Sequence, residues 1–359
     1  MIPSFSNVHS RFKFNEISYG HRELKDVAYS FVKEGLAFEK SIGVFLLDWL
    51  DDNDYVIVQT SGSTGRPKRI KLQKQAMEHS AITTGNYFNL KPGDSALHCL
   101  PSNFIAGKMM LVRALILGLE LDVVAPSSNP LEHISKRYGF CAMVPLQLEN
   151  AIGQLKNIKT LIVGGATVSS DLQQKLKGLS TKVFATYGMT ETVSHIAIKP
   201  LNHIEGIANK GLRDENFEVL TAISISQDER DCLVINAPNL NPAPIITNDV
   251  VKLTSETTFQ ILGRDDNVIN SGGIKLFPEQ IEAKLKPYLS DRFFIASKTD
   301  SSLGEQLIMV VEGDSNTLDS SVFKKLDTYE KPGHIYNVKR FCETDSGKIQ
   351  RKKTLALLK

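Results

Sequence analysis

A run of hydroxyl-bearing residues, glycines and two cations follows a short apolar segment at residues 55–58. The run reads Thr60, Ser61, Gly62, Ser63, Thr64, Gly65, Arg66, Pro67 and Lys68. Glycines let backbone N–H groups approach phosphate oxygens closely, the hydroxyl groups add donors, and Lys68 supplies a point charge. These residue types at this spacing predict a phosphate-binding loop. An exposed turn rich in serine and glycine is the alternative interpretation.

The segments on either side of this loop, residues 55–58 and 69–72, read as short strands. The loop therefore joins two strands, whereas a Walker A loop opens a helix and ends in Gly-Lys-Ser/Thr. Pro67 stands where the Walker motif has its second glycine. The sequence excludes a Walker A site.

Several further motifs follow in a fixed order, and with the loop they resemble the adenylate-forming superfamily of acyl-CoA synthetases, luciferases and peptide-synthetase adenylation domains. The motifs are Gly164-Gly165-Ala166, Tyr187-Gly188-Met189-Thr190-Glu191, Asp249, Gly263-Arg264-Asp265-Asp266, Ser271-Gly272-Gly273 and Ser346-Gly347-Lys348. Within that superfamily the chain is most similar to o-succinylbenzoate-CoA ligases, through residues 103–110 and 190–195. The resemblance spans residues 60 to 348. The part before residue 60 is shorter than in most members, which predicts a shortened N-terminal subdomain.

The resemblance implies an α/β fold with two domains. Residues 1–264 would form an AMP-binding domain of mainly parallel sheets flanked by helices, and residues 265–359 a small, mobile α+β lid. The sequence pattern agrees, because short apolar runs alternate with longer amphipathic ones from residue 55 to about 190, as in βαβ units. The amphipathic runs are residues 107–117 and 131–138. In the second unit we expect helices near residues 278–285 and 321–326, and strands near 293–296, 307–311 and 335–338.

The activity implied by the resemblance is the ATP-dependent activation of a carboxylate as an acyl-adenylate, followed by thioester formation with coenzyme A. Negative charge then builds at phosphorus and on the leaving pyrophosphate, so the site must supply cations and N–H donors. By resemblance, Lys68 and the loop hold the outer phosphates. Mg²⁺, which prefers oxygen ligands, would be held by Glu191 with Thr190 and Thr64 nearby. From the residues alone, Thr190 and Glu191 could equally be the N-terminal pair of a helix.

The same resemblance assigns the nucleotide-contacting residues. Adenine would lie between the Gly164, Gly165 and Ala166 segment and the ring of Tyr187, which Gly188 follows. Asp249 would accept hydrogen bonds from the ribose hydroxyls. Arg264 would contact the ribose or stabilise the closed arrangement of the two domains. A solvated loop carboxylate is the alternative for Asp249.

Three further assignments concern the C-terminal unit. Lys348 would bridge the acid and the nucleotide during adenylation, although in isolation it belongs to an ordinary basic tail. Asp266 would be the pivot about which the small domain rotates. After that rotation, Gly272 and Gly273 would wall a tunnel for the pantetheine arm of coenzyme A; a plain hairpin turn is the alternative.

The acid-binding pocket is the least specified part of the site. Phe104 would line an aromatic slot, and Lys108, Arg113 or His195 could meet a second carboxylate of the acid. A purely structural role for His195 is an equal alternative. Residues 109–111 fit a core helix better than a pocket.

The overall composition favours small-molecule partners. The chain has 359 residues with 42 basic and 40 acidic side chains, a formal charge of +2, so no strong field favours nucleic acid or membrane. The start of the chain lacks a signal-peptide pattern, and the most apolar long segment, residues 109–119, is too short to span a bilayer. A cytoplasmic enzyme is expected, with a homo-oligomer left open. Transfer to a carrier-protein phosphopantetheine, or a degenerate nucleotide-binding protein, are the competing functions; Lys348 and Glu191 argue against the latter.

Overall fold

Parallel strands form the centre of the fold. A computed structural model describes residues 4–59, 68–202, 216–313, 320–343 and 349–358. The parallel strands lie in the order β6-β5-β7-β8-β9 and are β5 (Ser95–His98), β6 (Glu120–Val123), β7 (Tyr138–Met143), β8 (Ile158–Val163) and β9 (Lys182–Gly188). Their carboxyl ends meet at one edge, where open α/β sheets bind ligands.

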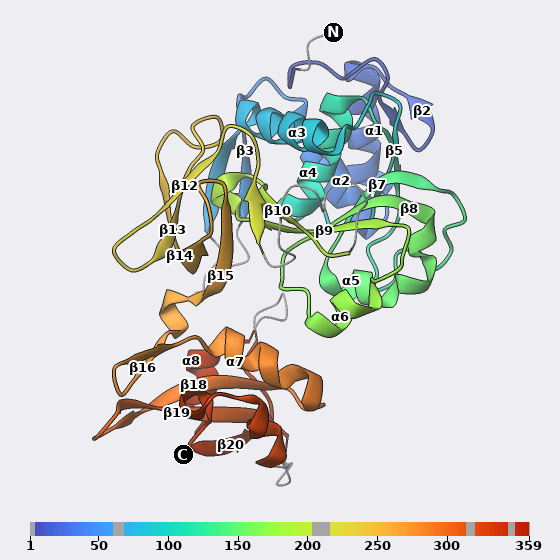
Figure 1. Cartoon of the computed structure of the whole chain (residues 1–359). Helices are drawn as coiled ribbons and strands as arrows, with labels where there is room; N and C mark the ends of the chain where they lie inside the picture. The colour runs from blue at the N-terminus through green and yellow to red at the C-terminus, as the bar shows by residue number, and fades with distance from the viewer. Residues whose placement is uncertain (1–3, 60–67, 203–215, 314–319, 344–348, 359) are drawn as a thin grey trace.

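Helices cover both faces of these strands (Figure 1). On one face lie α1 (His21–Glu34), α2 (Ala37–Trp49), α3 (Lys74–Phe88) and α4 (Ile105–Leu117); on the other lie α5 (Pro145–Asn150), the 3₁₀-helix η1 (Ile152–Asn157) and α6 (Ser170–Lys175). Strand β7 shows why two cores result. Phe140 and Ala142 pack in the first core, while Cys141 and Met143 pack in the second, as the two-residue period of a strand requires.

Further strands, most of them antiparallel to their neighbours, extend the sheet at both ends to thirteen, in the order β12-β13-β14-β15-β11-β10-β9-β8-β7-β5-β6-β1-β2. The added strands are β1 (Lys13–Phe14), β2 (Ile17–Ser18), β10 (His195–Pro200), β11 (Phe217–Val219), β12 (Ser224–Gln227), β13 (Cys232–Asn236), β14 (Ile245–Leu253) and β15 (Thr258–Arg264). β1 runs parallel to β6, with Lys13 opposite Glu120. A separate antiparallel pair, β3 (Tyr55–Gln59) and β4 (Arg69–Gln73), flanks the predicted phosphate loop, so the two strands expected there are confirmed.

A smaller α+β unit follows β15 and is drawn in orange and red in Figure 1. Its elements are the 3₁₀-helix η4 (Asp265–Asn267), β16 (Ile269–Ser271), β17 (Ile274–Leu276), α7 (Pro278–Leu285), η5 (Lys286–Tyr288), β18 (Phe293–Asp300), β19 (Gly304–Glu312), η6 (Ser320–Lys325), η7 (Thr328–Glu330), β20 (His334–Val338) and α8 (Arg351–Leu355). Its five-stranded sheet has a hydrophobic cluster of its own on each face. The expected α7 helix and the strands of this unit are confirmed.

The expected fold class is confirmed, with one local correction. Residues 131–137 form turns and irregular backbone, and strand β7 begins at Tyr138, so the helix expected over residues 131–138 is wrong. Leu131 and Tyr138 are buried, but the residues between them are mostly exposed, which leaves no continuous apolar face to hold a helix against the core. The expected helix at 107–117 is present as α4. Within the described ranges no helix is both long and apolar enough to cross a membrane.

Candidate active site

A cavity of about 210 Å³ opens at the carboxyl ends of β7, β8 and β9, against helix α4. Its walls are mostly apolar, from Leu100, Ile105, Ala142, Met143, Val144, Ile162 and Val193. Polar groups enter it at three places: Arg113 from α4, the Gly164-Gly165 segment after β8, and Thr190, Ser194 and His195 after β9. An apolar cavity with a few convergent polar groups is typical of a small-molecule site.

A second, larger cavity of about 510 Å³ adjoins the first, and both are lined by Gly165, Thr186 and Gly188. It brings together residues that the sequence places far apart, namely Ala166, Tyr187, Asp249 and Arg264. Sequence reasoning missed its other wall, which helix α7 of the small unit supplies through Glu279, Gln280 and Ala283. The Oε2 atom of Glu279 is buried and has no hydrogen-bond partner among the described residues.

Asp249 is held by two donors in this cavity. The Tyr187 hydroxyl donates to Oδ2 at 2.6 Å, and Arg264 donates to Oδ1 at 3.2 Å. Burial, and then the charge of Asp249, raise the pKa of Tyr187, so the phenol remains a donor. The ring of Tyr187 also packs against Phe259 and Phe217, with centroids 5.4 and 6.0 Å away. A ribose diol that reached Asp249 would therefore replace protein donors already in place.

Arg264 also reaches the segment between the two units. Its Nη2 atom donates to Asp266 Oδ2 at 2.8 Å, and Asn248 donates to the other oxygen of Asp266 at 3.2 Å. The carboxylate expected to bind ribose and the carboxylate expected at the pivot thus share one arginine. Any group that draws Arg264 toward one of them weakens its contact with the other.

The turn after β9 has a strained backbone. Val193 has φ +66° and ψ −50°, and the Ser194 amide donates to the Thr192 carbonyl at 2.7 Å, which makes a classic γ-turn. A β-branched residue rarely adopts this conformation, and such strain is held where the surroundings fix it. Here the Val193 side chain is fully buried in the core against α4. The turn sets Ser194 and His195 at the end of the first cavity.

Arg113 is the most unusual charged group of the first cavity. It is 2% exposed, and burial lowers its pKa to about 10, so it stays a cation at neutral pH. Its guanidinium donates to the hydroxyls of Ser194 at 2.7 Å and Thr84 at 3.4 Å. No carboxylate among the described residues lies within ion-pair distance of it. A buried charge without a counter-charge is costly, which points to an anionic ligand.

Phe104 and Lys108, the other candidates for the acid pocket, do not line either cavity. Phe104 precedes α4 and is 47% exposed, and Lys108 lies over the ring of Phe45 at 4.9 Å. Ala106 and Arg113 are seven residues apart and share one face of α4, whereas Lys108 and Arg113 are five apart and do not. One signal in the sequence singled out Arg113, because it interrupts the apolar segment 109–119.

A family description for AMP-binding enzymes matches residues 26–214, which is more than half of the chain. The chain belongs to the AMP-binding enzyme family. It is 26% identical to a probable 2-succinylbenzoate–CoA ligase of Mycobacterium tuberculosis over 326 residues, covering 84% of each chain. A 2-succinylbenzoate–CoA ligase of Lactococcus lactis is 26% identical over 330 residues, covering 85% of this chain and 71% of that one.

Solved structures of similar proteins agree with this family. An acyl-CoA synthetase (AMP-forming)/AMP-acid ligase II-like protein of Dyadobacter fermentans is 34% identical, with a TM-score of 0.61, covering 93% of this chain and 98% of that chain. The O-succinylbenzoate coenzyme A synthetase of Bacillus subtilis, solved with ATP and magnesium ion, has a TM-score of 0.73 at 19% identity and covers 83% of this chain and 69% of that one. The second likeness shows the fold.

Several residues that an AMP-binding enzyme would use lie outside the described part of the chain. They are Thr60, Ser61, Gly62, Ser63, Thr64, Gly65 and Lys348. Lys68 is described and immediately precedes β4, at the end of the loop. The roles of all these residues remain predictions.

The expected Mg²⁺ ligands are compatible with an ion held mainly by ATP. Thr190 and Glu191 form the 3₁₀-helix η2 (Thr190–Thr192), where Thr190 lines the first cavity and Glu191 is exposed. Across the described ranges no cluster of three or more His, Cys, Asp or Glu side chains could hold a metal by itself. Mg²⁺ that bridges phosphates needs only one or two carboxylates, so these residues fit that role.

Gly272 and Gly273 make the turn between β16 and β17, both with positive φ, and the Gly272 amide donates to Leu303. This is the hairpin that the sequence left open as an alternative. Its part in binding coenzyme A remains a prediction.

Proposed function

We propose that this AMP-binding enzyme activates o-succinylbenzoate with ATP, releases pyrophosphate, and transfers the acyl group from the acyl-adenylate to coenzyme A. The family and the names of the similar ligases support the adenylate and thioester steps. ATP and coenzyme A as substrates favour the cytoplasm as its place of action. Domains comprising residues 1–264 and 265–359, with Asp266 as the pivot, belong to the same proposal.

The observation that carries the choice of acid is the buried guanidinium of Arg113, which has no carboxylate beside it among the described residues. An acid with two carboxylates can present one to the nucleotide and the other to Arg113, and its body can fill the apolar walls between them. A monocarboxylic acid would leave Arg113 buried without a counter-charge. A site that binds a polar group of its substrate rejects ligands without that group far more strongly than an apolar pocket rejects ligands that are one methylene shorter.

Each of the expected site residues would carry one part of the chemistry. Arg113 would hold the distal carboxylate, so that the reactive carboxylate lies toward Thr190 and the shared wall of the two cavities. Asp249, Tyr187 and Arg264 would hold the ribose, and Gly164, Gly165 and Ala166 would border the adenine. Mg²⁺, held by Glu191 with the phosphates, would offset the charge that develops on the leaving pyrophosphate. Lys68 would hold the outer phosphates, and Lys348 would join acid to nucleotide.

The test is pyrophosphate release from ATP with o-succinylbenzoate, benzoate, acetate and a fatty acid, each with and without coenzyme A. We expect o-succinylbenzoate to be the fastest acid. Arg113→Ala should lower kcat/KM for o-succinylbenzoate about 10²- to 10³-fold and change kcat/KM for benzoate little. Only o-succinylbenzoate has a second carboxylate that would lose a buried charged contact. The exposed Arg137→Ala is the matched control and should behave as wild type.

Other outcomes would contradict the proposal in distinct ways. A fatty acid or acetate as the fastest acid would overturn the assigned substrate. Pyrophosphate release without a coenzyme A thioester would favour transfer to a carrier protein. No pyrophosphate release with any acid would favour a nucleotide-binding protein without turnover.

A further inference from the structure

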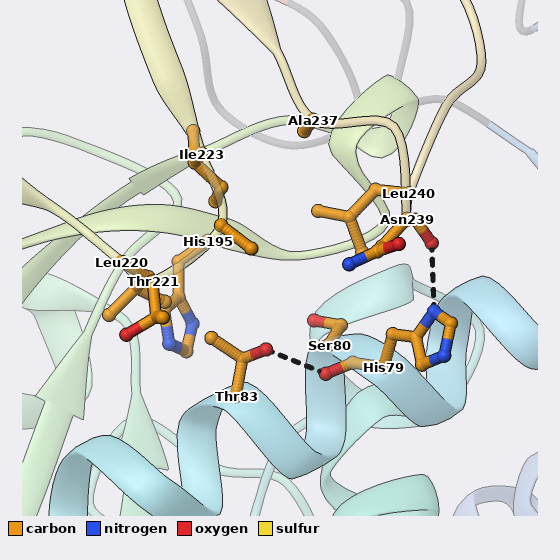
Figure 2. A pocket seen from close by; sticks show the side chains of 11 residues that line it. His79, Ser80, Thr83, His195, Leu220, Thr221, Ile223, Ala237, Asn239 and Leu240 are labelled. Carbon is orange, nitrogen blue, oxygen red and sulfur yellow. Dashed lines mark hydrogen bonds between the residues drawn. The ribbon is translucent and has the colours of Figure 1, made fainter.

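His195 lies between the Arg113 cavity and a smaller cavity on its other side. The smaller cavity has a volume of about 20 Å³, which is room for about one water molecule. Figure 2 shows the imidazole of His195 entering this space toward helix α3, where it lies near Leu220 and Thr221. His195 therefore lines both spaces and lies between them.

The protonation of His195 can be assigned from its neighbours. Nδ1 lies 3.4 Å from Arg113 Nη2, and a guanidinium only donates hydrogen bonds, so Nδ1 must accept. Nε2 lies 3.4 Å from the Thr84 hydroxyl, whose own hydrogen goes to the Ser80 carbonyl at 2.9 Å. Thr84 therefore accepts from Nε2–H. The network fits a neutral imidazole that carries its proton on Nε2.

Arg113 is thus held by three neutral acceptors, in Thr84, Ser194 and His195. Neutral acceptors fix the plane and direction of a guanidinium without cancelling its charge, so the charge remains for a ligand. Burial, and then the positive charge of Arg113, hold the pKa of His195 well below its ordinary value. No second cation forms beside Arg113 at neutral pH.

We propose that His195 is a positioning residue for acid selection. Its neutral imidazole directs the guanidinium of Arg113 into the Arg113 cavity, and it separates that cavity from the smaller cavity behind it. The proposal rests on Arg113 binding the second carboxylate of the acid. It differs from direct substrate contact by His195, because Nδ1 is already engaged by the arginine. The length of acid that fits would then be set by where His195 holds Arg113.

The experiment compares variants that keep or remove the acceptor at Nδ1. His195→Asn carries an amide oxygen that can take the place of Nδ1, whereas His195→Gln reaches the place of Nε2 and His195→Phe keeps only the ring shape. We expect His195→Asn to keep the KM for o-succinylbenzoate within about threefold of wild type. His195→Phe and His195→Gln should raise that KM about 10- to 100-fold, the value of one hydrogen bond to a charged group. The kcat/KM for benzoate should change little in all three.

The outcomes separate this inference from the proposed function. If Arg113→Ala impairs turnover of o-succinylbenzoate but His195→Phe and His195→Gln leave its KM unchanged, the role of His195 is overturned and the function stands. If all three His195 variants lower kcat/KM for o-succinylbenzoate and for benzoate equally, His195 supports the fold only and the inference also fails. If Arg113→Ala has no effect, the assignment of the acid fails first. Should His195→Phe not fold, the Asn and Gln variants decide between the same outcomes.

Discussion

One imidazole outside the two main cavities is buried without a counter-charge. His98 ends strand β5, and its Nε2 atom lies 2.9 Å from the Ser102 hydroxyl, while Nδ1 has no partner among the described residues. Burial lowers the pKa of His98 to about 4. The unfolded chain therefore takes up this proton at a higher pH than the folded chain does.

The sign of the resulting pH dependence follows from linkage. Between pH 6.5 and about 4 the unfolded state binds the proton and the folded state does not, so the free energy of unfolding falls as the pH is lowered. From pH 7.5 to pH 5, His98 should contribute about 2 kcal/mol of this loss. Urea unfolding of His98→Gln at both pH values should show a correspondingly smaller loss than wild type. The exposed His133→Gln serves as control; equal losses in wild type and His98→Gln would contradict the prediction.

The sequence specifies the nucleotide side of the site better than the acid side. Gly165, Ala166, Tyr187, Asp249 and Arg264 were predicted as one group and line one cavity, although their contacts with a nucleotide remain predictions. On the acid side, α4 is buried on nearly every face, with ten buried residues that include Lys108 and Arg113, so periodicity does not show which face meets a ligand. Periodicity alone therefore could not separate Lys108 from Arg113; only the position of Arg113 within the apolar segment 109–119 singled it out. The γ-turn at Val193 has no sequence signal, since valine disfavours it.

At the scale of elements, the pairing of β9 and β10 positions the acid-binding corner. The two strands are antiparallel, with Gly188 opposite His195 and an irregular register between His195 and Ala197. A Cβ atom added to Gly188 would meet the Ser194 carbonyl oxygen and lie 2.5 Å from the His195 Cα. Real Cβ atoms do not approach backbone so closely, so the strands would have to separate.

We expect Gly188→Ala to displace His195 and, with it, the acceptor side of Arg113. The variant should lower kcat/KM for o-succinylbenzoate about tenfold or more and destabilise the large domain by about 1–3 kcal/mol, as overpacking does. Gly153→Ala is the matched control, because its added Cβ would meet no atom within 4 Å beyond the adjoining backbone. Thermal melts and pyrophosphate release measure both effects. A Gly188→Ala protein as active and stable as the control would show that this close approach does not matter.

Element boundaries were predictable where the apolar segment was long, as at the end of the thirteen-residue α4, and failed where it was short. The segment 131–137 has apolar residues at helical spacing, yet it only returns the chain to the start of β7. Tertiary contacts override such weak local signals.

At the scale of the whole molecule, the turn between β12 and β13 holds both the connecting segment and the small unit. Arg230 pairs with Asp265 at 2.9 Å, and Asp231 pairs with Lys275 of β17 at 3.3 Å. Both pairs are largely exposed, so each contributes little by itself. Weak contacts of this kind would permit the proposed rotation of the small unit.

Asp266→Pro tests whether the rotation pivots at this residue. Proline fixes φ near −65° and restricts Asp265, so the small unit should be held in one orientation, by resemblance the adenylating one. Exchange of pyrophosphate with ATP should stay within about threefold of wild type, while formation of the coenzyme A thioester should slow about tenfold or more. Asp266→Ala is the control, because it removes the contacts with Arg264 and Asn248 but leaves the backbone free. Stopped-flow measurement of each half-reaction decides, and a Pro variant that slows neither step would move the pivot elsewhere.

The place of β1 beside β6, near one end of the large sheet, has a consequence for biosynthesis. Lys13 and Phe14 pair with Glu120 and Leu121, so among the described strands they have only the short neighbour β2 as a partner until about a hundred further residues have been made. At a translation rate of about 5 to 20 residues per second, that interval is on the order of 5 to 20 s. The small unit has no such delay, since the strand pairings described for it all fall after residue 268. A nascent chain should therefore depend on chaperones while its first half is made, and far less while its last hundred residues are made.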